Sequence, residues 1–344
     1  MRLLKLLLIL CVWAAGPASA GPLEDGVAAS RNGDYATALR LLRPLADEGN
    51  AVAQLNLGFM YNLGRGVPED LAAAASWYRK AAEQGDARAQ NNLGTMYDTG
   101  QGVPLDHAAA ASWYRKAAEQ GVATAQLNLG FLYSHGRGVP RDPAAAAAWF
   151  RKAADQGYPE AQNNLGVMCE RGEGVPKDYA AAVSWYRKAA EQGHARAQHN
   201  LGLMYNHGRG VPRDHAAAAA WYLKAADQGD SASQVKLGIF YGTGQGVSPD
   251  PAAAASWFRK AADQGEAAGQ YNLGIMSASG KGVPLDYVQA HKWFNLASLR
   301  YAASDKESRE DAVRDREIVA AKMTPAQIAE AEKLAREWKP KMGR

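Results

Sequence analysis

The sequence predicts an all-α protein, a solenoid of stacked helix-turn-helix repeats. Three observations carry this prediction. A 36-residue period runs through most of the chain, each period holds two stretches with helical spacing of apolar residues, and no strand signal appears anywhere. A single helical hairpin cannot bury both of its faces, but stacked copies can, and they form a quasi-one-dimensional array.

Composition removes several classes of protein. The 344 residues include 39 Lys and Arg against 35 Asp and Glu, and a net charge of +4 with interspersed signs does not indicate nucleic-acid binding. Two cysteines cannot make a disulfide scaffold, and 47% apolar residues exclude a disordered chain. No apolar run approaches the ~20 residues that a transmembrane helix needs.

Residues 1–20 have the pattern of a secretory signal peptide. Arg2 and Lys5 precede an apolar stretch from residue 6 to 15, and Ala18-Ser19-Ala20 has the small residues of a cleavage site. The alternatives are a buried core helix or an uncleaved anchor, but the rest of the chain offers nothing for such a segment to pack against. We therefore expect cleavage near Ala20 and a periplasmic or secreted location.

Two residue types recur with a step of 36 residues. The glycines that end the Leu-Gly pairs are Gly58, Gly94, Gly130, Gly166, Gly202, Gly238 and Gly274. The tryptophans of the second half of each period are Trp77, Trp113, Trp149, Trp185, Trp221, Trp257 and Trp293. Seven units therefore fill residues 49–300, which leaves residues 21–48 before them and residues 301–344 after them.

The unit 85–120 shows how each period predicts two helices. Asp86 is a candidate N-cap for a helix with apolar residues at helical spacing, and Asp106 is a candidate N-cap for an Ala-rich second helix. A loop rich in Gly and Pro, residues 100–104, separates the two. Gly94 lies within the first helix, where glycine costs roughly 1 kcal/mol against Ala, so we expect a neighbouring helix to approach closely there.

The recurring blocks resemble the Sel1-like repeat, a relative of the tetratricopeptide repeat with a longer loop between its helices. The blocks are Ala-x-Ala-Gln-x-Asn-Leu-Gly-x-x-Tyr, then Gly-x-Gly-Val-Pro-x-Asp, then Trp-Tyr-Arg-Lys-Ala-Ala-Glu-Gln-Gly. The resemblance covers all seven units. It implies a tetratricopeptide-like α/α superhelix and a role in assembling protein complexes, without implying a particular partner.

Both ends of the array depart from the repeat, as expected of capping units. Residues 21–48 form a degenerate N-terminal unit without the glycine-rich loop, and residues 301–344 form a helical C-terminal cap. Thr324 and Gln327 predict a capping box with Pro325 at the first helical position. The final helix then carries an apolar stripe that we expect to cover the last repeat; its residues are Ile328, Ala331, Leu334, Ala335 and Trp338.

The sequence predicts no catalytic residue, metal site or cofactor. The glycine-rich loops follow helices and lack the spacing of phosphate-binding motifs, and no two histidines have the i, i+4 spacing of a helical metal site. Cys169 occupies a position that five other units fill with Tyr, so a buried thiol is expected. Some Sel1-like proteins carry paired cysteines in every repeat and are associated with β-lactam binding, but this chain lacks those cysteines.

Positions that vary between copies of the first helix are candidates for partner binding, because the shared packing does not fix them. By the resemblance, the first helices line the concave face of the superhelix. Drift at unconstrained surface sites is the alternative explanation. The candidate residues are Leu55, Phe59, Asn62, Asn91, Asp98, Leu127, Phe131, Ser134, Asn163, Glu170, His199 and Asn206.

The functional prediction is a non-enzymatic extracytoplasmic scaffold, expected to be a monomer, that binds a peptide or partner protein on this face. The resemblance adds envelope signalling and exopolysaccharide regulation as settings. The alternatives are a cell-wall or β-lactam-binding enzyme and a carbohydrate-binding protein.

Overall fold

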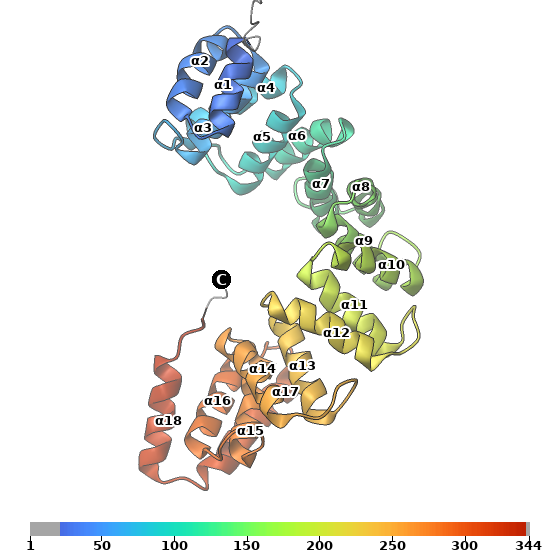
Figure 1. Ribbon diagram of the computed structural model, residues 1–344, viewed down its shortest axis with the longest axis vertical. Coiled ribbons are helices and arrows are strands. Elements are labelled where there is room, and N and C mark those ends of the chain that lie inside the picture. Colours follow the sequence, from blue (N-terminus) through green and yellow to red (C-terminus); the bar gives the residue numbers. More distant parts are fainter. Residues whose placement is uncertain (1–20, 342–344) are drawn as a thin grey trace, which may run out of the picture. The chain divides into compact units, whose positions relative to one another are not determined.

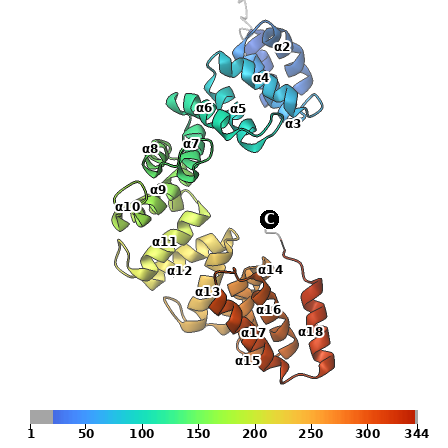
Figure 2. The same ribbon diagram turned by 180° about the vertical axis from the view of Figure 1, so that it is seen from behind.

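The computed structural model describes residues 21–341, which form eighteen α-helices and no strand. The prediction of an all-α repeat solenoid is therefore confirmed. The helices pack in consecutive pairs, which Figures 1 and 2 show from opposite sides. The chain divides into two compact units with a boundary between Arg141 and Asp142.

The first unit contains α1 (Pro22–Arg31), α2 (Tyr35–Asp47), α3 (Ala51–Leu63), α4 (Leu71–Glu83), α5 (Ala87–Thr99), α6 (His107–Glu119) and α7 (Ala123–His135). The second contains α8 (Pro143–Asp155), α9 (Pro159–Arg171), α10 (Tyr179–Glu191), α11 (Ala195–His207), α12 (His215–Asp227), α13 (Ser231–Thr243), α14 (Pro251–Asp263), α15 (Ala267–Ser279), α16 (Tyr287–Arg300), α17 (Lys306–Ala320) and α18 (Pro325–Glu337). From α3 to α16, odd-numbered helices are the first helices of the repeats and even-numbered helices are the second.

The predicted caps and turns set the helix ends. The Asp86 carboxylate accepts a hydrogen bond from the Ala89 N–H at 2.9 Å, and Asp106 does the same for the Ala109 N–H at 2.9 Å. Gly100 ends α5 with a φ of +70°, a left-handed conformation that suits glycine. The loop thus returns the chain at a fixed place, which sets where the second helix packs.

The mid-helix glycines mark close approaches between the two helices of a repeat. A Cβ added at Gly94 would lie 2.7 Å from the Tyr114 ring of the paired helix, below any normal contact distance. The same holds in five other repeats, where the ring belongs to Tyr78, Tyr186, Tyr222, Phe258 or Phe294. The predicted reason for glycine at this position is therefore confirmed.

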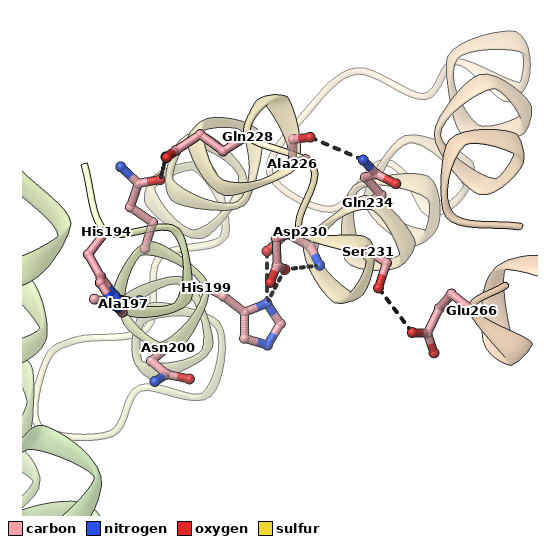
Figure 3. A network of polar contacts seen from close by, with 12 residues as sticks. His194, Ala197, His199, Asn200, Ala226, Gln228, Asp230, Ser231, Gln234 and Glu266 are labelled. Carbon is pink, nitrogen blue, oxygen red and sulfur yellow. Dashed lines mark hydrogen bonds and ion pairs between the residues drawn. The ribbon is translucent and has the colours of Figure 1, made fainter. Parts of the chain in front are cut away.

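Buried glutamines join each repeat to the one before it. Gln198 of α11 donates a hydrogen bond to the Ala190 carbonyl of α10 at 3.0 Å, and its Oε1 accepts one from Gln228 of α12 at 2.7 Å. Figure 3 shows the equivalent bond of the next repeat, from Gln234 to the Ala226 carbonyl at 3.1 Å. One side chain therefore connects three successive helices, and the arrangement recurs along both units.

Two further helices follow the last repeat, and both pack against α16. α17 is strongly charged but buries Ala312 and Val319. α18 begins with the predicted capping box at Thr324, and its Trp338 ring lies 6.4 Å from the Trp293 ring in an edge-on arrangement. The apolar stripe of the final helix therefore contacts the core of the last repeat.

The predicted signal peptide, residues 1–20, lies outside the described residues. Among residues 21–341, no helix combines the length and hydrophobicity needed to cross a bilayer.

Candidate protein-interaction face

In each of the two units, the first helices expose a stripe with two rows of side chains, which we call the first-helix face of that unit. One row has an asparagine in six of the seven repeats and a lysine in the remaining one. The other row lies three residues further on and is mostly apolar. Residues three apart lie on the same side of a helix, so the rows run side by side. The pairs are Asn56 and Phe59, Asn92 and Thr95, Asn128 and Phe131, Asn164 and Val167, Asn200 and Leu203, Lys236 and Ile239, and Asn272 and Ile275; all are exposed or half-buried.

Part of the predicted binding stripe lies between repeats instead of on this face. Leu55, Leu127 and Asn163 are only 1%, 4% and 2% exposed. Leu55 packs in a cluster with Leu93 of the following repeat. These three residues cannot touch a partner without unpacking the repeats, so they do not belong to the first-helix face. His199 and Asn91 occupy the same position in their repeats and are half-buried.

A second group of predicted residues is half-buried and mostly holds the two helices of one repeat together. The Asp98 carboxylate lies 2.8 Å from Nδ1 of His107, and Asn206 Oδ1 lies 3.0 Å from Nδ1 of His215. Glu170 accepts a hydrogen bond from the Tyr186 hydroxyl at 2.8 Å. Ser134 bonds the Phe131 carbonyl of its own helix at 2.9 Å, and Asn62 is half-buried.

The predicted residues that fit the first-helix face are the two phenylalanines. Phe59 is 40% exposed, and Phe131 is half-buried. The asparagine row was missed because the comparison between repeats sought positions that vary, whereas this position is nearly constant. The constant asparagine could be read from the sequence, but its half-buried place on the first-helix face could not.

The asparagine row can recognise a bound main chain. A primary amide offers both donors and an acceptor, which matches the N–H and C=O groups of an extended peptide. Three of the amides already use a donor. Asn56 bonds the Val52 carbonyl at 2.7 Å, Asn272 bonds the Ala268 carbonyl at 2.8 Å, and Asn200 bonds Asn163 Oδ1 of the preceding repeat at 2.9 Å. The Nδ2 atoms of Asn92 and Asn164 are buried and have no hydrogen-bond partner among the described residues, so these two donors are out of reach of a bound peptide.

A His-Asp-Ser group between α11 and α13 does not have the geometry of a catalytic triad. The same nitrogen, Nδ1 of His199, lies 2.8 Å from Ser233 Oγ and 3.4 Å from Asp230 Oδ1, as Figure 3 shows for Asp230. A relay needs the acid and the hydroxyl on opposite ring nitrogens. Ser233 is also fully buried, so it cannot meet a substrate. Burial lowers the pKa of His199, and the nearby Asp230 carboxylate partly opposes this effect.

Neither a reactive thiol nor a metal site emerges from the described residues. Cys169 is buried, and burial raises the pKa of its thiol, which disfavours the nucleophilic thiolate. No group of three or more His, Cys, Asp or Glu side chains within residues 21–341 could hold a metal ion.

The basic residues of the second helices are engaged by aromatic rings. Six lysines place their ammonium groups 3.7 to 4.1 Å from the centroid of the tryptophan ring three residues before them, a cation–π geometry. Arg79 donates a hydrogen bond to the Tyr97 hydroxyl of the next repeat at 2.6 Å. The lysines thus contact a ring of their own helix and Arg79 contacts the next repeat, so these cations do not form a free basic strip.

Comparison with known proteins identifies the repeat. The family model for the Sel1 repeat matches residues 51–86, 87–122, 123–158, 159–194, 195–230, 231–266 and 267–300. A Sel1 repeat protein from Oxalobacter formigenes has 34% sequence identity and a TM-score of 0.65, over 70% of this chain and 97% of that one. A protective antigen of uropathogenic Escherichia coli with an SLR fold has 33% identity and a TM-score of 0.47, over 92% of this chain and 83% of that one.

No protein of the curated collection matches the chain. The seven consecutive matches extend without a gap from residue 51 to residue 300, which is well over half of the 344 residues. The helix pairs, glycine contacts and loops described above recur at the same 36-residue step. The chain therefore belongs to the Sel1 repeat family.

Proposed function

We propose that this chain is a non-enzymatic extracytoplasmic scaffold that binds an extended peptide or a partner protein along the first-helix face. Sel1 repeat proteins mediate protein–protein interactions, and family membership supports the general role. The observation that carries the proposal is an apolar row in each unit: at the same repeat position, Phe59 of the first unit and Ile275 of the second are each 40% exposed. Apolar side chains in a row beside amides suit a peptide in an extended conformation.

The extracytoplasmic location rests on the sequence pattern of residues 1–20. Envelope signalling and exopolysaccharide regulation are the settings in which such a scaffold would act. Cell fractionation, with the N-terminal mass of the purified protein, tests the location: we expect a chain that begins after Ala20. An uncleaved N-terminus in the cytoplasmic fraction would contradict this part of the proposal.

Photo-crosslinking in intact cells tests the binding face. The reactive group replaces Leu203, in the apolar row of α11, and in a matched control it replaces Lys224 on the second helix of the same repeat. We expect a discrete protein adduct from position 203 and none from position 224. Adducts from position 224 alone, or from neither position, would contradict the proposed face.

A further inference from the structure

Lys236 interrupts the asparagine row and is unlike the other lysines of the repeats. It replaces the asparagine on α13, is half-buried, and has no carboxylate within 4 Å among the described residues. Six lysines of the second helices lie over a tryptophan ring, whereas Lys236 makes no such contact within residues 21–341. A half-buried ammonium group without a partner is unfavourable, so a ligand that pairs with it would gain binding free energy.

The surroundings of Lys236 are basic. The helices α11 and α13 contain Arg196, Lys236 and two histidines, and their sequences contain no Asp or Glu. Burial is the main cause of the lowered pKa of His199 and of His207, and the Lys236 charge lowers both pKa values further. The charged groups that influence these histidines thus include Lys236, and the two helices offer it no carboxylate of their own.

The acidic groups near this cluster already have partners. Asp230 caps α13 by accepting a hydrogen bond from the Ser233 N–H at 2.7 Å, and it also lies 3.4 Å from His199. Glu170 accepts a hydrogen bond from the Tyr186 hydroxyl and lies 3.6 Å from Arg209. Neither carboxylate is placed to neutralise Lys236.

Apolar side chains flank the lysine on the same face. Leu203, Ile239 and Ile275 occupy the apolar row on three successive first helices of the second unit. Leu203 and Ile239 are half-buried and Ile275 is exposed. A ligand that spans these helices thus meets apolar contacts along one row and amides with one cation along the other.

We infer that the second unit binds an extended acidic peptide segment, with an Asp or Glu side chain paired to Lys236 and neighbouring apolar side chains on Leu203, Ile239 and Ile275. This inference rests on the proposed function and specifies the chemistry of the partner. The amides at Asn200 and Asn272 flank the lysine in the same row. Each already donates one hydrogen bond, to Asn163 Oδ1 at 2.9 Å and to the Ala268 carbonyl at 2.8 Å, so their oxygens are the groups left to accept from a peptide N–H. A basic or uncharged segment would leave the lysine without a partner.

The test selects 12-residue peptides from a random library displayed on phage, with the purified protein as target. We expect the selected sequences to share one Asp or Glu between apolar residues. A synthetic peptide of this kind is then titrated by fluorescence anisotropy against the protein, Lys236→Asn and Lys260→Asn. Asn is the residue of six other repeats at position 236, so this variant keeps the fold, and Lys260 on the second helix is the matched control.

We expect Lys236→Asn to weaken binding about 3- to 10-fold and Lys260→Asn to leave it unchanged, since a charge-assisted hydrogen bond is lost only in the first variant. A peptide with Asn or Gln in place of its acid should bind both variants equally. An Ile275→Asp variant separates the two proposals. If it abolishes binding while Lys236→Asn has no effect, the acidic specificity is wrong and the binding face stands. If no peptide binds, or Ile275→Asp changes nothing, both are wrong.

Discussion

Gly202→Ala is a sharp test of the packing inside a repeat, because two physical effects oppose each other there. Alanine favours a helix over glycine by about 1 kcal/mol, so propensity alone predicts a more stable protein. The structure predicts a less stable protein. A Cβ at position 202 would lie 2.7 Å from both Cδ1 and Cε1 of Tyr222.

The Tyr222 ring has little freedom to move away. It is fully buried, and it packs edge-on against Phe240 with ring centroids 5.6 Å apart. Overpacking of this kind costs typically ~1–3 kcal/mol, and the ring's confinement places this site in the upper part of that range. After the gain in propensity, we expect Gly202→Ala to lower the free energy of unfolding by about 1–2 kcal/mol.

Urea denaturation followed by far-ultraviolet circular dichroism measures this change, and Gly242→Ala is the matched control. Gly242 lies in the last turn of α13, where a Cβ would meet only the Ala254 Cβ at an ordinary 3.8 Å. The control should therefore be as stable as the original protein or more stable, by up to about 1 kcal/mol. An increase in stability for both variants would refute the claim that the mid-helix glycines exist for close packing.

Three further changes test other contacts, each by urea denaturation. Gln198→Leu removes two hydrogen bonds of a buried side chain, one to Ala190 of the preceding repeat and one to Gln228 of its own repeat. It should lower the free energy of unfolding by about 1–2 kcal/mol; no change would mean that these bonds contribute nothing. Burial lowers the pKa of His199 below its ordinary 6.5 despite Asp230, so unfolding takes up a proton and stability falls as the pH drops below that value. His199→Asn should flatten the profile between about pH 7 and 5, and an equally steep profile would contradict the assignment. Trp338→Ala removes the edge-on contact with Trp293 and should cost about 1–3 kcal/mol; an unchanged midpoint would show that α18 does not cover the last repeat.

Much of the fold could be predicted because the information is local and repeated seven times. The cap at Asp106, the loop that begins at Gly100 and the capping box at Thr324 depend on a few neighbouring residues, and the structure places all three as expected. The close approach at Gly94 could also be inferred, because a repeated cost in helix propensity requires a repeated gain in packing.

The candidate face was predicted less well, because it depends on how one repeat lies against the next. Leu55 and Asn56 are adjacent in sequence, yet Leu55 is 1% exposed between repeats and Asn56 is half-buried on the open stripe. A residue on a helix advances by about 100°, so an error of one position moves a side chain from the surface to an interface. The position of Leu55 varies between repeats because it lies between neighbouring repeats, and each pair of repeats packs with different side chains there.

The hydrogen bonds that pair two glutamine side chains within a repeat end before Gln270. Its Oε1 is buried without a hydrogen-bond partner among residues 21–341, whereas the equivalent oxygen of Gln234 accepts a bond from Gln264. The matching position of the last unit holds Arg300, whose guanidinium lies 4.3 Å from the Trp338 ring centroid. Duplication or loss of a whole unit in the interior would keep every glutamine pair intact. The array can thus change its length by 36 residues at a time, while Arg300 and the helix α18 close its last repeat in the same way.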